Sequence, residues 1–129
     1  MFERIELEKT GNLPFGCEIV SHKNYGNIFF KNIGWLVNDE PFSVIDYEQE
    51  INQETTWNSA VRDWLLASTR RIPKSLSGFK LCLLGTMYQK DGRRFFEYLY
   101  KEGNAWITGI HYLDQKLTPD FIIPCFENN

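Results

Sequence analysis

The sequence predicts an α+β fold in which a twisted antiparallel sheet of about five to seven strands carries one principal helix. Aromatic residues make up 16% of the chain, a content typical of sheets. Three apolar or alternating segments follow one another after residue 78, and one amphipathic stripe precedes them. At 129 residues, the chain is long enough to bury a core and predicts a single domain, residues 1–129.

The first part of the chain predicts short strands separated by turns. Phe2–Glu8 alternates apolar and charged residues, as a half-buried strand does. Cys17–Val20 and Asn27–Phe30 are further short strands, and Phe42–Tyr47 is another that leads into an acidic segment.

The principal helix is expected to begin at Thr55 or Thr56, since either side chain can cap a helix N-terminus, and to end before Pro73. Charged residues such as Arg62 fall largely outside its apolar stripe. The stripe comprises Trp57, Val61, Trp64, Leu65, Ser68 and Ile72.

A meander of strands follows the helix. Phe79–Tyr88 is almost continuously apolar, which predicts a central strand covered on both faces. Arg94–Lys101 alternates after an Asp-Gly turn, and Ala105–Leu113 is the next strand. The last strand, Phe121–Phe126, contains Pro124 and is therefore expected at an edge of the sheet.

The composition gives no positive case for a cofactor, a metal or a membrane. Cys17, Cys82 and Cys125 are widely spaced and form no zinc or redox motif, and Cys82 lies in an apolar run that predicts burial. The N-terminus does not resemble a signal peptide, and no apolar stretch is long enough to span a bilayer. We therefore expect a cytoplasmic protein without a catalytic, cofactor or metal site, and no small-molecule ligand.

Particular residues could support two other functions. An enzyme would need a deep pocket around His22 or His111, the two imidazoles, but neither is paired in sequence with a nucleophile. A single-stranded nucleic-acid-binding module could use an aromatic sheet face, although alternating aromatics more often cover a core and the net charge of −3 opposes phosphate binding. That face would comprise Phe96, Tyr98 and Tyr100 beside Arg93 and Arg94.

Residues 39–54 contain six carboxylates and no Lys or Arg. The charge of the chain is correspondingly uneven: residues 1–64 carry 11 acidic and 5 basic residues, whereas residues 65–129 carry 6 and 9. A solvated face is the ordinary interpretation of such a segment. An acidic surface can also mimic the phosphates that a basic groove binds. On an extended strand, Asp46, Glu48 and Glu50 would share one side.

The run DYEQE at residues 46–50, Trp57 and Trp64 with a short helix, LLGTMY at 83–88 and FFEYLY at 95–100 together resemble immunity proteins of bacterial contact-dependent growth inhibition systems. The branch that is most similar protects against toxin domains that cleave ribosomal RNA. The resemblance covers residues 43–113. It implies a small cytoplasmic protein that binds one cognate nuclease toxin domain 1:1 and blocks it without chemistry of its own.

The resemblance also implies which residues contact the toxin. Trp57 and Trp64 would belong to the core, and the acidic segment would face a basic nuclease surface. Tyr47 adds a rigid amphipathic side chain of the kind that is enriched at interfaces. The candidate toxin-binding residues are Asp39, Glu40, Asp46, Tyr47, Glu48, Glu50 and Glu54.

Overall fold

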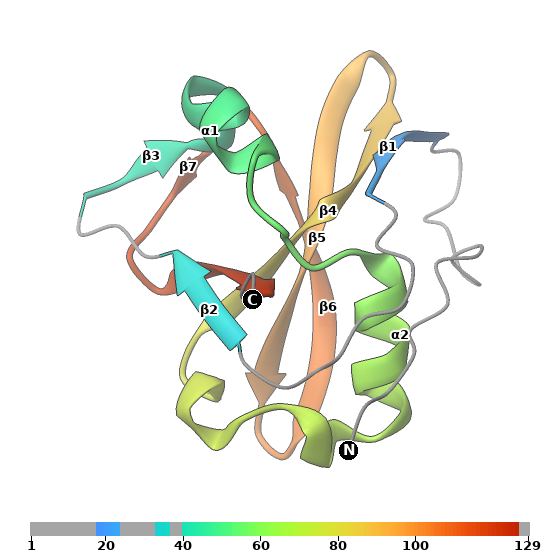
Figure 1. The fold of residues 1–129 in the computed structure, drawn as a ribbon, viewed down its shortest axis with the longest axis vertical. Helices are drawn as coiled ribbons and strands as arrows, with labels where there is room; N and C mark the ends of the chain where they lie inside the picture. The colour runs from blue at the N-terminus through green and yellow to red at the C-terminus, as the bar shows by residue number, and fades with distance from the viewer. Residues whose placement is uncertain (1–17, 24–32, 37–39, 127–129) are drawn as a thin grey trace.

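A computed structural model describes residues 18–23, 33–36 and 40–126. The fold is α+β, as predicted: a six-stranded sheet and a two-stranded sheet are packed with two short helices (Figure 1). The predicted strands Phe2–Glu8 and Asn27–Phe30 lie outside the described residues. The strand predicted at Cys17–Val20 corresponds to β1 (Glu18–His22).

The predicted meander is confirmed as three antiparallel strands: β4 (Lys80–Lys90), β5 (Arg93–Glu102) and β6 (Ala105–Tyr112). The β4–β5 turn has two residues with positive φ, Asp91 at 53° and Gly92 at 78°. Such values are those of the tight turn that Asp-Gly pairs favour, because glycine has no Cβ to clash.

Pro124 predicted that the last strand lies at an edge of the sheet, and this prediction was wrong. β8 (Phe121–Phe126) lies between β2 (Ile33–Leu36) and β4, in the order β2-β8-β4-β5-β6. Its pairing with β4 is parallel, so the sheet is not wholly antiparallel. β1 pairs with the far end of β4, and the small sheet joins β3 (Phe42–Ser43) to β7 (Lys116–Leu117).

Pro124 is accommodated inside the sheet because its missing N–H is not needed there. Trp57 N–H donates to the Pro124 carbonyl at 3.2 Å, but the proline cannot return a bond to the Trp57 carbonyl. That carbonyl instead accepts from Gly85 N–H of β4, at 2.8 Å. The carbonyl of Gly85 accepts from Lys23 N–H at 2.7 Å. The backbones of Lys23 and Trp57 therefore pair with β4 at Gly85, between the part of β4 that pairs with β1 and the part that pairs with β8.

The principal helix is shorter than predicted and begins later. α2 spans Ser59–Ala67, and the side chain of Asn58 caps it by accepting from Val61 N–H at 3.0 Å. The predicted caps were wrong because Thr55 accepts from Phe126 N–H and Thr56 bridges to β8, which holds this segment extended. Two 3₁₀ helices follow, η2 (Thr69–Arg71) and η3 (Lys74–Leu76).

The six-stranded sheet has a core on each face, which explains the continuous apolar run of β4. The first core lies under α2 and includes Trp57, Val61, Leu65, Leu81 and Leu99. The second lies under the segment formed by 3₁₀ helix η1 (Val44–Tyr47) and α1 (Glu48–Asn52). It includes Val44, Ile51, Cys82, Phe96, Leu113 and Leu117.

Candidate protein-binding site on the acidic segment

The acidic segment is helical rather than extended. β3 contains only two residues, and the chain then turns into η1 and α1. Val44 and Ile51 are 0% and 4% exposed and anchor the turns to the second core. Their spacing of seven residues is two helical turns, which places both on one side of a helical segment. The predicted strand Phe42–Tyr47 is therefore wrong beyond Ser43.

Asp46, Glu48 and Glu50 do not form the aligned row that a strand would give. Asp46 accepts a hydrogen bond from the Ser43 hydroxyl at 2.7 Å. Glu48 binds the Arg94 guanidinium of β5 through two hydrogen bonds of 2.6 and 2.8 Å. Glu50 is exposed and pairs with no cation in the part of the chain that the structure describes. Glu48 is therefore largely neutralised, whereas Asp46 and Glu50 present charge.

Arg94 fastens the segment to the sheet. The hydrogen bonds that Arg94 donates to Glu48 raise the pKa of Arg94 above its usual value, although partial burial opposes this. The pair is only partly exposed and bidentate, the geometry in which an arginine and a carboxylate bind best. Its effect is to hold the first turn of α1 against β5.

Lys23 binds backbone carbonyls at the C-terminal end of α1. Its ammonium donates to the carbonyls of Asn52 and Glu54, both at 2.6 Å. Burial lowers the pKa of Lys23 more than the attraction of Cys125 and Glu54 raises it. The segment without basic residues in sequence thus receives two cations from elsewhere in the fold, Lys23 and Arg94.

The remaining sequence candidates have different positions. Glu40, Tyr47 and Glu54 are exposed, and Tyr47 retains 46% of its surface. Asp39 lies outside the described residues. The structure therefore groups Asp46, Tyr47, Glu50 and Glu54 on one short exposed segment and turns Glu48 towards Arg94.

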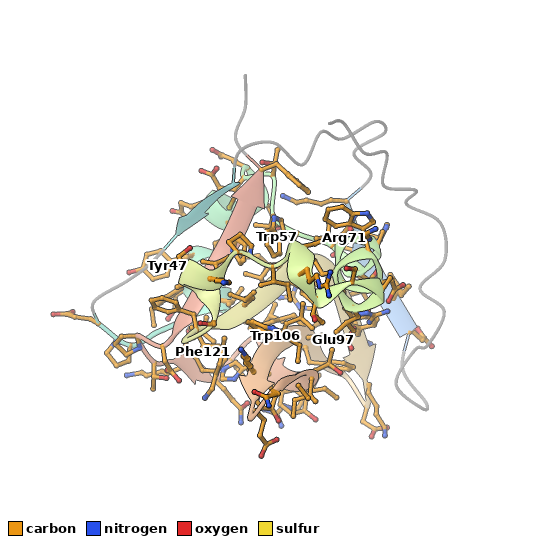
Figure 2. The ribbon with its side chains drawn as sticks, turned by 90° about the horizontal axis from the view of Figure 1, so that it is seen from below. Tyr47, Trp57, Arg71, Glu97, Trp106 and Phe121 are labelled. Carbon is orange, nitrogen blue, oxygen red and sulfur yellow. The ribbon has the colours of Figure 1, made fainter. Side chains whose placement is uncertain are left out.

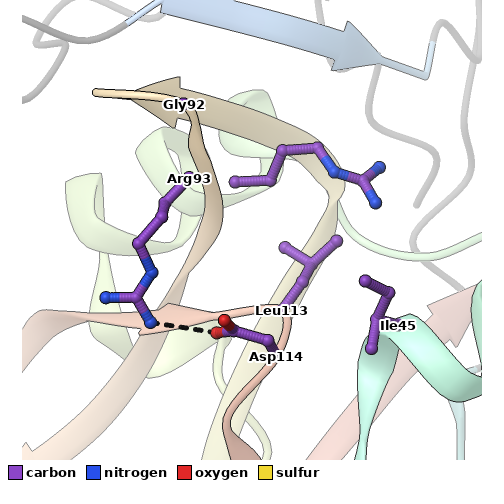
Figure 3. Close-up of a pocket in the computed structure, with 6 residues that line it drawn as sticks. Ile45, Gly92, Arg93, Leu113 and Asp114 are labelled. Atoms are coloured by element: carbon purple, nitrogen blue, oxygen red, sulfur yellow. Dashed lines mark hydrogen bonds and ion pairs between the residues drawn. The ribbon is translucent and has the colours of Figure 1, made fainter.

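Ile45 belongs to the same surface but was missed as a candidate from sequence. Its side chain is 49% exposed, and Tyr47 beside it packs edge-on against Phe42 at 5.4 Å between ring centroids. Ile45 borders a shallow hollow of about 160 Å³ with Leu113 and Asp114, and Arg93 forms an ion pair with Asp114 at 3.0 Å (Figure 3). An apolar residue next to acids was the signal that could have identified it.

The two histidines do not share a site. His22 Nδ1 lies 2.6 Å from Thr86 Oγ1, and His22 borders a cavity of about 310 Å³ beneath α1. His111 lies on β6 between the rings of Phe96 and Phe121, with centroids 5.5 and 5.1 Å away. No group of three His, Cys, Asp or Glu side chains suited to a metal occurs among the described residues.

We expect His111 to make stability depend on pH. Burial lowers the pKa of His111 below its usual 6.5, with Lys80 acting in the same direction and the Gln115 carbonyl and Asp114 opposing it. As pH falls through about 6.5, the unfolded chain takes up the proton first, so the free energy of unfolding decreases. His111→Gln should flatten this decrease between about pH 7 and pH 5 in urea denaturation. Equal pH slopes for both proteins would contradict the expectation.

The aromatic face considered for nucleic acid is mostly core. Phe96 is fully buried, and Tyr98 packs edge-on against Phe121 with 5.2 Å between ring centroids. Arg94, which was expected to flank this face, is engaged by Glu48. The interpretation of Phe96 as a core residue is confirmed.

None of the described helices is long and apolar enough to cross a membrane. Comparison of the chain with protein-family models, with curated proteins and with solved structures gives no match.

Proposed function

We propose that this protein is an immunity protein that binds a basic nuclease toxin domain 1:1 in the cytoplasm and occludes its active-site surface. One observation carries the proposal: exposed acids accompany two exposed apolar side chains on residues 45–54, a short segment that is helical up to Asn52 and held to the sheet by Arg94 and Lys23. The acids are Asp46, Glu50 and Glu54, and the apolar side chains are Ile45 and Tyr47.

The two kinds of residue suit different parts of binding. Acids opposite a basic cleft raise the association rate by attracting the partner before contact. An exposed tyrosine and isoleucine supply apolar area that is buried once contact is made, and tyrosine is enriched among residues that dominate binding energy. A charged rim around an apolar centre is the usual anatomy of a protein interface.

The segment is also held in one conformation before it binds. Val44 and Ile51 are buried beneath it, Arg94 pairs with Glu48 at its start, and Lys23 binds the carbonyls at its end. A preorganised binder loses less conformational entropy on association, which increases its affinity. The resemblance of the sequence to immunity proteins supports the same proposal, and under it Asp39 and Glu40 stay candidate toxin contacts.

Charge reversal on this segment should slow association with the toxin. Asp46→Lys, Glu50→Lys and Glu54→Lys, combined, are expected to reduce the association rate roughly tenfold or more at low salt, because attraction becomes repulsion. The measurement is stopped-flow or surface plasmon resonance with the inactivated C-terminal domain of the large secreted protein expected to be encoded beside this gene. The difference should shrink as salt is added.

Glu102→Lys is a matched control for Glu50→Lys, because Glu102 is also exposed, lies at the end of β5 opposite to Arg94, and both changes alter the net charge by two units. Only Glu50→Lys should slow association markedly. Equal rates for the two variants would remove this segment from the interface, and no complex with the neighbouring toxin would refute the proposed function.

A further inference from the structure

A second surface of opposite charge lies at the other end of the molecule from α1, where η2 and η3 meet the turn between β5 and β6 (Figure 1). A cavity of about 670 Å³ opens there. We call it the basic groove and define it by four of its lining residues: Arg70, Lys74, Lys101 and Trp106.

The cations of the basic groove lack an ion-pair partner among the described residues. Arg70, Lys74 and Lys101 are exposed, and none of the described residues that line the cavity with them is an Asp or Glu. Within the described ranges none of the three forms an ion pair, whereas Lys80 and Arg93 pair with nearby carboxylates at 3.1 and 3.0 Å. Three like charges around one cavity repel one another, and an anion bound there would relieve the repulsion.

Trp106 adds a flat aromatic surface to these charges. It pairs with Lys101 across β5 and β6, and it is half-buried, with part of its ring against the first core and part lining the groove. Figure 2, seen from below, looks onto this end of the molecule and labels Trp106. Asn104, in the turn before it, supplies an amide that can both donate and accept hydrogen bonds.

We propose that the basic groove binds a nucleoside phosphate, either free or as a unit of single-stranded RNA. Phosphates would lie on Arg70, Lys74 and Lys101, and a base would stack on Trp106, the combination that single-stranded nucleic acid sites use. The cavity volume falls within the range of small-ligand sites, about 300–1,000 Å³. An acidic peptide would use the cations but would have no need of the ring. This activity goes beyond toxin binding and requires no toxin.

The test is fluorescence anisotropy with a labelled, mixed-sequence single-stranded RNA octamer at low salt, with adenosine 5′-monophosphate as competitor. Lys74→Gln and Lys101→Gln should each weaken binding and reduce the slope of log affinity against log salt by about one. Lys90→Gln is the matched control, since Lys90 is also an exposed lysine. It is the last residue of β4, beside the turn between β4 and β5, and does not line the basic groove. This variant should leave affinity and slope unchanged.

Trp106 variants separate stacking from charge. Trp106→Leu should weaken octamer binding roughly tenfold, and Trp106→Phe, which retains a ring, should recover most of the loss. Thermal melting of each variant verifies that the first core is intact.

Displacement by adenosine 5′-monophosphate would assign the groove to free nucleotides, and octamer binding that resists this competitor would assign it to RNA. Three results would overturn the proposal. Neither the octamer nor adenosine 5′-monophosphate binds, or Lys90→Gln weakens binding as much as Lys74→Gln and Lys101→Gln do. In the third result, hexaglutamate, an acidic peptide, displaces the octamer and the Trp106 variants bind as well as the unchanged protein. The toxin measurements on Glu50→Lys are independent of all three.

Discussion

Glu97→Ala is expected to lower the free energy of unfolding by about 3–5 kcal/mol, because it leaves the Arg62 guanidinium buried without its main partner. Arg62 and Glu97 are 4% and 7% exposed, and a guanidinium N–H of Arg62 donates to Glu97 Oε1. Tyr88 donates to the same oxygen at 2.7 Å. Urea denaturation followed by fluorescence measures the loss.

The pKa values of the network indicate how its charges are balanced. Burial opposes the charge of Arg62, yet Glu97 and Asp63 outweigh it and the pKa of Arg62 lies above its usual value. Burial, together with Glu97, raises the pKa of Tyr88, so its hydroxyl remains a donor. The pair joins α2 to β5, and Figure 2 labels its carboxylate member, Glu97.

Asp63→Ala is the matched control for Glu97→Ala. Asp63 also binds Arg62, at 2.9 Å, but its side chain is 47% exposed, so the loss should be below about 1 kcal/mol. Replacing both members of the buried pair, as Arg62→Met with Glu97→Leu, should recover much of the stability because no uncompensated charge remains. A loss for Glu97→Ala no larger than that for Asp63→Ala would contradict the assignment.

Gly85→Ala is expected to destabilise the fold by about 3 kcal/mol, since a methyl group there has no space. A Cβ at Gly85 would lie 2.6 Å from the Thr56 carbonyl oxygen, 2.8 Å from that of Trp57 and 2.9 Å from Asn58 Cβ. Two of these neighbours are backbone atoms held against β8, so they cannot move aside without breaking hydrogen bonds. Thermal melting and urea denaturation report the change.

Gly78→Ala provides the comparison. No atom lies within 4 Å of a Cβ at Gly78, and its φ is not in the left-handed region. We expect its stability to be unchanged or slightly raised, because alanine restricts the unfolded chain. If Gly85→Ala melted at the same temperature as Gly78→Ala, the close packing of Thr56 on β4 would be refuted.

The sequence could predict the parts of the fold that depend on neighbouring residues. A continuous apolar run predicted β4, and alternation after an Asp-Gly pair predicted β5, with β6 following it, because each hairpin is local. The position of β8 was predicted wrongly. A proline indicates an edge strand only where a neighbouring carbonyl would otherwise lack a donor. Here the neighbouring carbonyl, that of Trp57, accepts from Gly85 N–H instead, and no local sequence pattern indicates this contact.

The candidate site was predicted in composition but not in geometry. The alternation of acids suggested a strand, whereas the burial of Val44 and Ile51 under the second core produces a helical segment. Lys23 and Arg94, which hold it, are distant in sequence and could not be inferred from the acidic segment. Arg62 was likewise expected outside the apolar stripe, but it is buried. Its burial depends on the partner Glu97, which belongs to another element and could not be inferred from the helix alone.

The backbone hydrogen bonds that meet around Gly85, here called the Gly85 junction, have a consequence for the order of folding. The Gly85 junction joins four parts of the chain, around Lys23, Trp57, Gly85 and Pro124, whereas the hairpins of β4, β5 and β6 need only local contacts. Contacts between distant residues form more slowly because long loops must close first. Val44 and Ile51 of the acidic segment pack on a core that β4 and β5 help to build, so we expect this segment to take its shape after the meander has formed.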